Sequence, residues 1–192
     1  MKKLFMYSIL FTNCEYSVNF PFQLNYICIF FKKSNYKRKY TMKSNTNLIV
    51  SRASTLDNSE LAQIYLRSRI AAFPWVKHPQ ASDFIQDSKN ELILKAVLNN
   101  KIVGFLSFYQ QDNFIHLLFI DPAYIHSGIG SQLLFKIRQS ATALVTLNCV
   151  RQNNHALAFY KAQGFKIIGK SLWKSPAYYT LQDTKKEDYP LL

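Results

Sequence analysis

Glycine is scarce in this chain, so the place of each glycine is informative. Only 5 of the 192 residues are glycine, and Gly128 and Gly130 stand one residue apart in the stretch DPAYIHSGIGSQLL. No Gly-Lys-Ser or Gly-Lys-Thr follows, which excludes a nucleotide triphosphate loop. A dinucleotide-binding loop is excluded too, because Leu133 stands where that motif needs its third glycine.

Cysteine is equally rare, with three residues at Cys14, Cys28 and Cys149. Three scattered cysteines are too few for a disulfide framework, and no spaced histidines accompany them as a metal cluster would require. We therefore expect reduced thiols and no bound metal.

Long apolar runs are also lacking. Residues 4–11 and 20–31 are the most apolar stretches of the N-terminal region, and both fall short of the ~20 residues that a membrane-spanning helix needs. The start MKKLFMYSILF resembles a secretory signal, but Asn13 and Cys14 follow where small residues would mark a cleavage site. Signal peptide and membrane anchor remain alternatives, while the favoured expectation is a cytoplasmic protein without a membrane partner.

The first 41 residues differ in composition from the rest of the chain. They contain no alanine, glycine or aspartate, and they hold seven Lys or Arg against the single acidic residue Glu15. This segment therefore supplies much of the net charge of +13. We interpret residues 1–41 as a non-domain extension, from a mis-assigned start at Met1 or disordered, and residues 42–192 as one domain. Because the basicity lies upstream and no recognition motif appears, no nucleic-acid partner is expected.

The remaining sequence alternates between strand and helix patterns. A first helix is expected after Thr55, Asp57 or Asn58, with the apolar positions Leu61, Ile64, Tyr65 and Ile70 at helical spacing and Pro74 as its end. The expected strands are residues 47–54, 91–98, 101–110, 113–121, 143–150, 165–171 and 177–182. The expected helices are residues 55–73, 83–87, 131–142 and 154–163. This order predicts one mixed α/β sheet.

The two glycines of the opening stretch lie between a predicted strand and a predicted helix. The first N–H groups of a helix have no partner within the helix, and glycine lets an anion approach the backbone closely. The pattern indicates an anion site, although a plain helix start is the alternative on this evidence alone.

Two motifs together carry a resemblance to a known family. The segment LLFIDPAYIHSGIGSQLL, followed by LNCVRQNNHALAFYKAQGF, resembles the GNAT superfamily of acyl-CoA-dependent N-acetyltransferases. The second segment matches the family block Asn-x-x-Ala-x-x-x-Tyr-x-x-x-Gly-Phe at Asn153, Ala156, Tyr160, Gly164 and Phe165. The resemblance covers nearly all of residues 42–192. It implies a mostly antiparallel central sheet flanked by helices, with a splayed strand pair at the acyl-CoA site.

The resemblance also implies which residues hold acetyl-CoA, the acyl donor. The backbone of Leu118, Phe119 and Ile120 would pair with the pantetheine arm, and Asn153 would contact it unless it only caps its helix. The pyrophosphate would lie on the backbone N–H groups of His126, Ser127, Gly128, Ile129, Gly130 and Ser131. The chain departs from the family at Ile125, where a Gln or Arg is usual.

Two side chains are candidates for the chemistry, by direct attack of an amine on the acetyl group. Tyr160 matches the tyrosine that often protonates the thiolate, and an aromatic residue that packs on the sheet is the alternative. His116 is the candidate base, since histidine changes charge near neutral pH and alternation places it on one strand face with Leu118 and Ile120. A half-buried histidine that shapes the pocket is equally compatible with the pattern.

The acceptor is expected to be an amine of a small molecule or a peptide. Residues of the first helix, its following loop and the C-terminal strands would line its pocket: Tyr65, Arg69, Phe73, Trp75, Trp173 and Tyr178. Arg67 and Arg69 could instead bind an acidic acceptor. The sequence leaves open whether the protein is a monomer or a homodimer. A domain that binds CoA as a sensor or scaffold without turnover is the alternative function.

Overall fold

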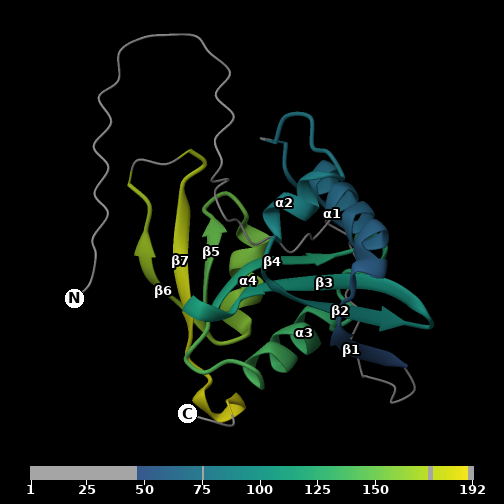
Figure 1. The fold of residues 1–192 in the computed structure, drawn as a ribbon. Helices are drawn as coiled ribbons and strands as arrows, with labels where there is room; N and C mark the ends of the chain where they lie inside the picture. Colours follow the sequence, from purple (N-terminus) through teal and green to yellow (C-terminus); the bar gives the residue numbers. More distant parts are fainter. Residues whose placement is uncertain (1–46, 75, 173–174, 190–192) are drawn as a thin grey trace, which may run out of the picture.

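The computed structural model describes residues 47–74, 76–172 and 175–189 (Figure 1). The expected extension at residues 1–41 lies outside this part of the chain, as do Trp75 and Trp173. The strands are β1 (Leu48–Arg52), β2 (Leu92–Leu98), β3 (Lys101–Tyr109), β4 (Phe114–Ile120), β5 (Thr146–Val150), β6 (Phe165–Lys170) and β7 (Tyr178–Asp183). The α-helices are α1 (Asn58–Ala72), α2 (Asp83–Asp87), α3 (Ile129–Arg138) and α4 (Asn154–Ala162).

The described strands form one sheet in the order β1-β2-β3-β4-β5-β7-β6. The pair β4 and β5 is parallel, and the other neighbouring pairs are antiparallel. The predicted α/β class with a mixed, mostly antiparallel sheet is therefore confirmed.

The parallel pair in the middle of the sheet separates after two residues. Phe114 pairs with Thr146 and Ile115 with Leu147, and the recorded pairing stops there although β4 continues to Ile120. Figure 1 shows the two strands diverging beyond this point. The splayed strand pair that the resemblance implied is present.

Asparagines shape two of the turns that connect the strands. Asn99 and Asn100 have φ angles of 50° and 62° between β2 and β3, as the predicted tight hairpin requires. Asn113 has a φ of 48° before β4, and its Oδ1 accepts hydrogen bonds from the backbone N–H groups of Thr142 and Ala143. These bonds hold the start of the 143–150 segment in a turn, so β5 begins later than predicted.

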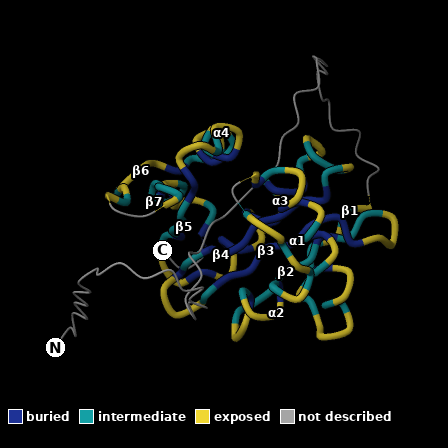
Figure 2. The backbone as a smooth tube through the Cα atoms, turned by 90° about the horizontal axis from the view of Figure 1, so that it is seen from above, coloured by how far each residue is buried: buried dark blue, intermediate teal, exposed yellow. Residues whose placement is uncertain are grey.

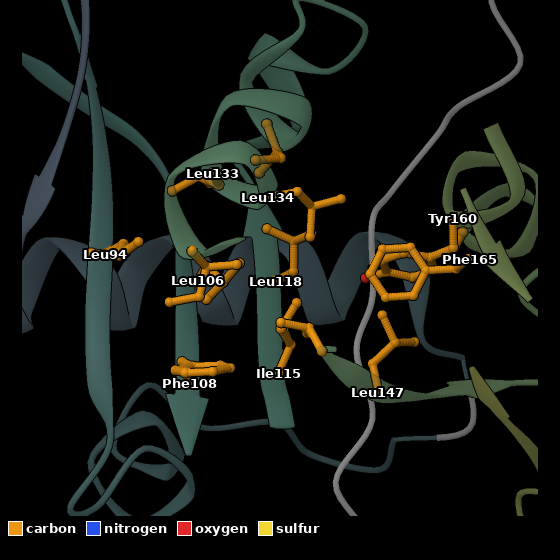
Figure 3. Close-up of a cluster of buried hydrophobic side chains, with 14 of the residues drawn as sticks. Leu94, Leu106, Phe108, Ile115, Leu118, Leu133, Leu134, Leu147, Tyr160 and Phe165 are labelled. Atoms are coloured by element: carbon orange, nitrogen blue, oxygen red, sulfur yellow. The ribbon is translucent and has the colours of Figure 1, made fainter. Parts of the chain in front are cut away.

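Two buried clusters lie on opposite faces of the sheet. The cluster under α3 and α4 contains Leu106, Leu118, Leu133 and Tyr160 among others, and Figure 3 shows part of it. The cluster under α1 and α2 contains Leu61, Ile64, Tyr65, Phe73, Phe84, Phe105 and Phe119. Figure 2 shows how burial concentrates in the central strands β3 and β4.

The α1 helix differs from its prediction at one residue. Leu61, Ile64 and Tyr65 are buried as expected, but 67% of Ile70 is exposed. Ile70 comes six residues after Ile64, which is more than one and a half helical turns, so it points away from the stripe that faces the sheet. The helix follows a capping box of Ser54 and Asp57, and Phe73 forms its C-terminal cap just before Pro74.

Candidate functional site

The candidate site begins where β4 ends. Asp121 stops the strand, and its Oδ1 accepts a hydrogen bond of 3.0 Å from the backbone N–H of Ala123. Its Oδ2 lies 2.6 Å from Nη2 of Arg67 on α1, and Ser68 donates a hydrogen bond to the carbonyl of Ile120. Helix α1 therefore fixes the end of β4 and the start of the following loop.

The loop after β4 is wound tightly before helix α3. His126 has a φ of 63° and Gly128 a φ of 80°, and Gly128 is the N-terminal cap of α3. The hydroxyl of Ser127 donates a hydrogen bond to the carbonyl of Tyr124. The helix begins at Ile129, two residues earlier than predicted, because Gly128 adopts the left-handed conformation that reverses the chain.

A cavity of about 230 Å³ lies against this loop. Its lining includes all six residues that the sequence predicted for the pyrophosphate, together with residues from β4, the preceding turn and α4: Ile120, Tyr124, Ile125, His126, Ser127, Gly128, Ile129, Gly130, Ser131 and Phe159. The first turn of α3 opens onto the cavity, and no acidic side chain is among its described lining residues. These residues fit a pyrophosphate.

Two of these lining residues correct or extend the sequence interpretation. Ile125, where the resemblance implied a Gln or Arg, packs against the cluster under α3 and offers no polar side chain to the cavity. Phe159 lines the cavity from α4. No pattern in the sequence indicated that this residue would lie beside the loop that precedes α3.

The end of β4 also packs tightly against β3. A Cβ atom on Gly104 would lie 2.6 Å from Cδ1 of Ile120 and 2.9 Å from the carbonyl oxygen of Phe119. Glycine at this position lets the two strands approach. The three predicted β4 residues split between faces, with Leu118 and Ile120 in the cluster under α3 and Phe119 in the cluster under α1.

Tyr160 lies on the α3 and α4 side of the sheet. Its side chain is fully buried, and its ring packs 5.4 Å from that of Phe165. Figure 3 shows the ring extending from α4 toward β4, in the cluster that also holds Leu118 and Leu147. The predicted general acid is thus directed at the region where β4 and β5 separate.

Asn153 is the N-terminal cap of α4. Its Oδ1 accepts a hydrogen bond of 3.0 Å from the backbone N–H of Ala156. The capping role that the sequence left open is therefore present, and it fixes the start of the helix that carries Tyr160.

His116 lies at an irregularity of β4. Leu117 pairs with Ser107 and Ile115 with Phe108, which leaves His116 as an extra residue in the strand. Its Nδ1 is 2.7 Å from Oε1 of Glu91, and its side chain is 11% exposed. The prediction that His116 shares a face with Leu118 and Ile120 is wrong. The bulge breaks the alternation and directs the imidazole to the α1 and α2 side.

Three carboxylates at four-residue intervals lie on that side: Asp83 and Asp87 at the two ends of α2, and Glu91 after it. Asp83 pairs with Arg69 at 2.6 Å, Asp87 accepts a hydrogen bond of 2.5 Å from the hydroxyl of Tyr65, and Glu91 contacts His116. Burial raises the pKa of Asp87 above its usual range, and burial together with the charge of Asp87 raises the pKa of the Tyr65 phenol. The four-residue spacing of these acidic residues can be read from the sequence, but their partners Arg69, Tyr65 and His116 cannot.

The predicted acceptor residues are only partly brought together. Tyr65 and Phe73 are buried beneath α1, and the guanidinium of Arg69 lies 4.7 Å from the centre of the Tyr65 ring. Arg67 and Arg69 are both paired with carboxylates of this chain, so neither presents an uncompensated charge to an acidic acceptor. Tyr178 lies half-buried on β7, and the two tryptophans fall outside the described residues.

The described residues offer neither a metal cluster nor a membrane-spanning helix. They contain no group of three or more His, Cys, Asp and Glu side chains that could hold a metal ion. None of the helices in this part of the chain is long and apolar enough to cross a membrane.

Comparison with known proteins agrees with this geometry. The family model for the acetyltransferase (GNAT) family matches residues 58–165. The peptidyl-lysine N-acetyltransferase YjaB of Escherichia coli (strain K12) is 30% identical over 127 residues, which cover 64% of this chain and 84% of YjaB. The solution structure of apo YjaB from Escherichia coli has a TM-score of 0.57 at 27% identity, and the match covers 70% of this chain and 96% of that structure.

A second solved structure shares the fold. The PaiA N-acetyltransferase of Thermoplasma acidophilum, solved in complex with coenzyme A, has a TM-score of 0.59 at 18% identity. The match covers 71% of this chain and 99% of the PaiA chain.

Proposed function

Since this chain belongs to the acetyltransferase (GNAT) family and is an N-acetyltransferase that uses acetyl-CoA, we propose that its acceptor is the side-chain amine of a peptidyl lysine. The similarity to YjaB, which is named a peptidyl-lysine N-acetyltransferase, supports this acceptor. The observation that carries the catalytic proposal is that β4 separates from β5 after Ile115. The part of β4 that is not paired with β5 runs from His116 to the loop that precedes α3.

The separated part of β4 binds the donor in this proposal. Backbone groups of Leu118, Phe119 and Ile120 have lost β5 as a partner, and a pantetheine amide offers the hydrogen bonds that a neighbouring strand would. The backbone N–H groups from His126 to Ser131 receive the pyrophosphate at the N-terminus of α3.

Tyr160 acts as the general acid. A phenol is protonated at neutral pH and gives its proton to a thiolate as the carbon–sulfur bond breaks. Its direction from α4 toward β4 supports this role.

His116 acts as the base from the opposite face of the sheet. The donor contacts lie toward α3 and α4, whereas His116 meets residues of the α1 and α2 side. An amine that enters from the α1 and α2 side therefore meets the base before it reaches the acetyl group in the separation between the strands.

A thiol-release assay with acetyl-CoA tests the acceptor. Peptides with a blocked N-terminus and one lysine are compared with matched peptides in which that lysine is norleucine, and with small amines. We expect thiol release and a mass gain of one acetyl group only where lysine is present. Thermal stabilisation by acetyl-CoA without thiol release from any amine would contradict the proposal and favour a CoA-binding module.

A further inference from the structure

His116 is held by a carboxylate that lies 25 residues earlier in the chain. Glu91 places Oε1 at 2.7 Å from Nδ1 of His116, while its Oε2 accepts a hydrogen bond from the hydroxyl of Ser107 on β3. Ser107 is fully buried, and the Glu91 side chain is 8% exposed. Both oxygens of Glu91 are thus fixed, and the imidazole is fixed with them.

This contact decides which imidazole nitrogen can accept a proton. A carboxylate accepts hydrogen bonds and has none to give, so Nδ1 carries hydrogen in the pair. The other ring nitrogen, Nε2, is then the acceptor. A histidine in this state is set up as a base.

Glu91 is also one of the residues that line a cavity of about 300 Å³, together with Arg52, Ser54 and Lys89.

We propose that Glu91 is a positioning residue that holds His116 with Nε2 toward the acceptor amine. The inference rests on the proposed function of His116 as the base. The ammonium gives one proton to Nε2, Nδ1 keeps its proton in the bond to Glu91, and the imidazolium returns the proton on Nε2 to water after the product has left. The nitrogen attacks the acetyl carbon, the carbon–sulfur bond breaks, and the thiolate takes the proton of Tyr160. The second proton of the attacking nitrogen restores Tyr160, so the net products are the amide, the thiol and one proton.

Other charged groups also face His116 and enter its pH dependence. Asp87 on α2 lies near enough to interact electrostatically with His116, and it is bonded to Tyr65 of α1. Arg69 lies over Tyr65 and is paired with Asp83. The test therefore removes the charge of Glu91 and leaves these groups in place.

The test compares Glu91→Gln, His116→Gln and the double variant in the full chain, with a lysine peptide as acceptor. We expect Glu91→Gln to lower kcat/KM about 10- to 100-fold and to move the acidic limb of its pH profile to lower pH, because the imidazolium loses a neighbouring negative charge. In the His116→Gln background, Glu91→Gln should have no further effect on the limb. Asp57→Asn, which removes another ion-paired carboxylate, is the control and should leave the limb in place.

An NMR titration of the His116 imidazole without substrate gives a second, activity-independent measurement. Its midpoint should fall in Glu91→Gln and not in Asp57→Asn. An unchanged midpoint in Glu91→Gln would overturn the inference. So would an acidic limb that stays in place in Glu91→Gln but disappears in His116→Gln, and in that case His116 would remain the base. Absence of thiol release by the wild-type protein with every lysine peptide would instead overturn the proposed acceptor, and the NMR midpoint would still decide the role of Glu91.

Discussion

The guanidinium of Arg67 lies 2.6 Å from the carboxylate of Asp121, at the residue where β4 gives way to the phosphate loop. Arg67 belongs to α1, on the face of the sheet opposite to α3, so this pair ties α1 to the loop that precedes α3. The Asp121 side chain is 8% exposed and also caps the turn that follows. The loop thus depends on a helix that precedes it by more than 50 residues.

Loss of this pair should weaken donor binding. We expect Arg67→Met to raise the KM for acetyl-CoA severalfold with a smaller change in kcat, because the loop that carries the backbone donors loses its anchor. The change in unfolding free energy should stay within about 1 kcal/mol, since Arg67 is half exposed. Steady-state kinetics measure both constants. Lys166→Met on the exposed face of β6 is the control, and an equal rise in KM there would contradict the assignment.

A side chain at Gly104 should disturb both stability and donor binding. In Gly104→Ala the new methyl group meets Ile120 and the backbone oxygen of Phe119, so β4 has to shift. We expect a loss of about 1–3 kcal/mol in unfolding free energy and weaker binding of acetyl-CoA by calorimetry. Gly169→Ala is the matched control, because its Cβ would lie 3.6 Å from the nearest atom. Similar losses in both variants would show that the close approach of β3 and β4 is not the cause.

Removal of the Tyr160 hydroxyl tests the general acid. We expect Tyr160→Phe to lower kcat about 100-fold or more, while the KM for acetyl-CoA changes less than about twofold, since the ring and its packing remain. Tyr189→Phe is the control because its hydroxyl bonds to Asp183, away from the cavity at the phosphate loop. Unchanged turnover in Tyr160→Phe would remove this residue from the mechanism.

A buried charge network should contribute to stability without entering the chemistry. Nε of Arg138, on α3, bonds to Asp183 at 2.5 Å, and its Nη2 donates to the carbonyl of Gln163 beyond α4. Asp183 is fully buried, so Arg138→Met leaves a buried carboxylate without its cationic partner, although the hydroxyl of Tyr189 still donates to it. We expect a loss of about 3–5 kcal/mol in urea unfolding. Adding Asp183→Asn should recover part of it, and an additive loss in the double variant would contradict the coupling.

The sequence predicted the parts of the fold that depend on local chemistry. The turn at Asn99 and Asn100 and the glycine loop at Gly128 follow from backbone conformations that few residues adopt, and such signals lie within a few positions of the chain. The sequence therefore predicted the glycine loop before α3, and the assignment of its residues to the pyrophosphate stays a prediction.

The missing parts depend on contacts between distant segments. The bulge at His116 arises from the register of β4 against β3, which no local pattern encodes. Its partner Glu91 lies just before β2, and Phe159 lines the cavity at the glycine loop from α4. The prediction for the sheet face of His116 was wrong because side chains alternate between faces only in a strand without a bulge.

The two aspartates Asp57 and Asp87 should give opposite pH dependences of stability. The bond with Lys95 lowers the pKa of Asp57, so this group stabilises the fold above the usual aspartate range and loses that contribution as the pH falls. Burial raises the pKa of Asp87, so the folded state binds its proton more readily and loses stability as the pH rises from about 4 through the raised value.

Substitution by asparagine separates the two aspartates. At pH 7, Asp57→Asn should unfold at lower urea concentration than the wild type, whereas Asp87→Asn should unfold at the same or a higher concentration because it removes a buried charge and keeps an acceptor for Tyr65. Near pH 3, where both carboxyls bind protons more fully, the variants should approach the wild type. Urea unfolding followed by circular dichroism at both pH values measures these differences. Equal destabilisation of both variants at pH 7 would show that the Asp87 charge is compensated in the folded protein, by Arg69 or by the neighbouring His116.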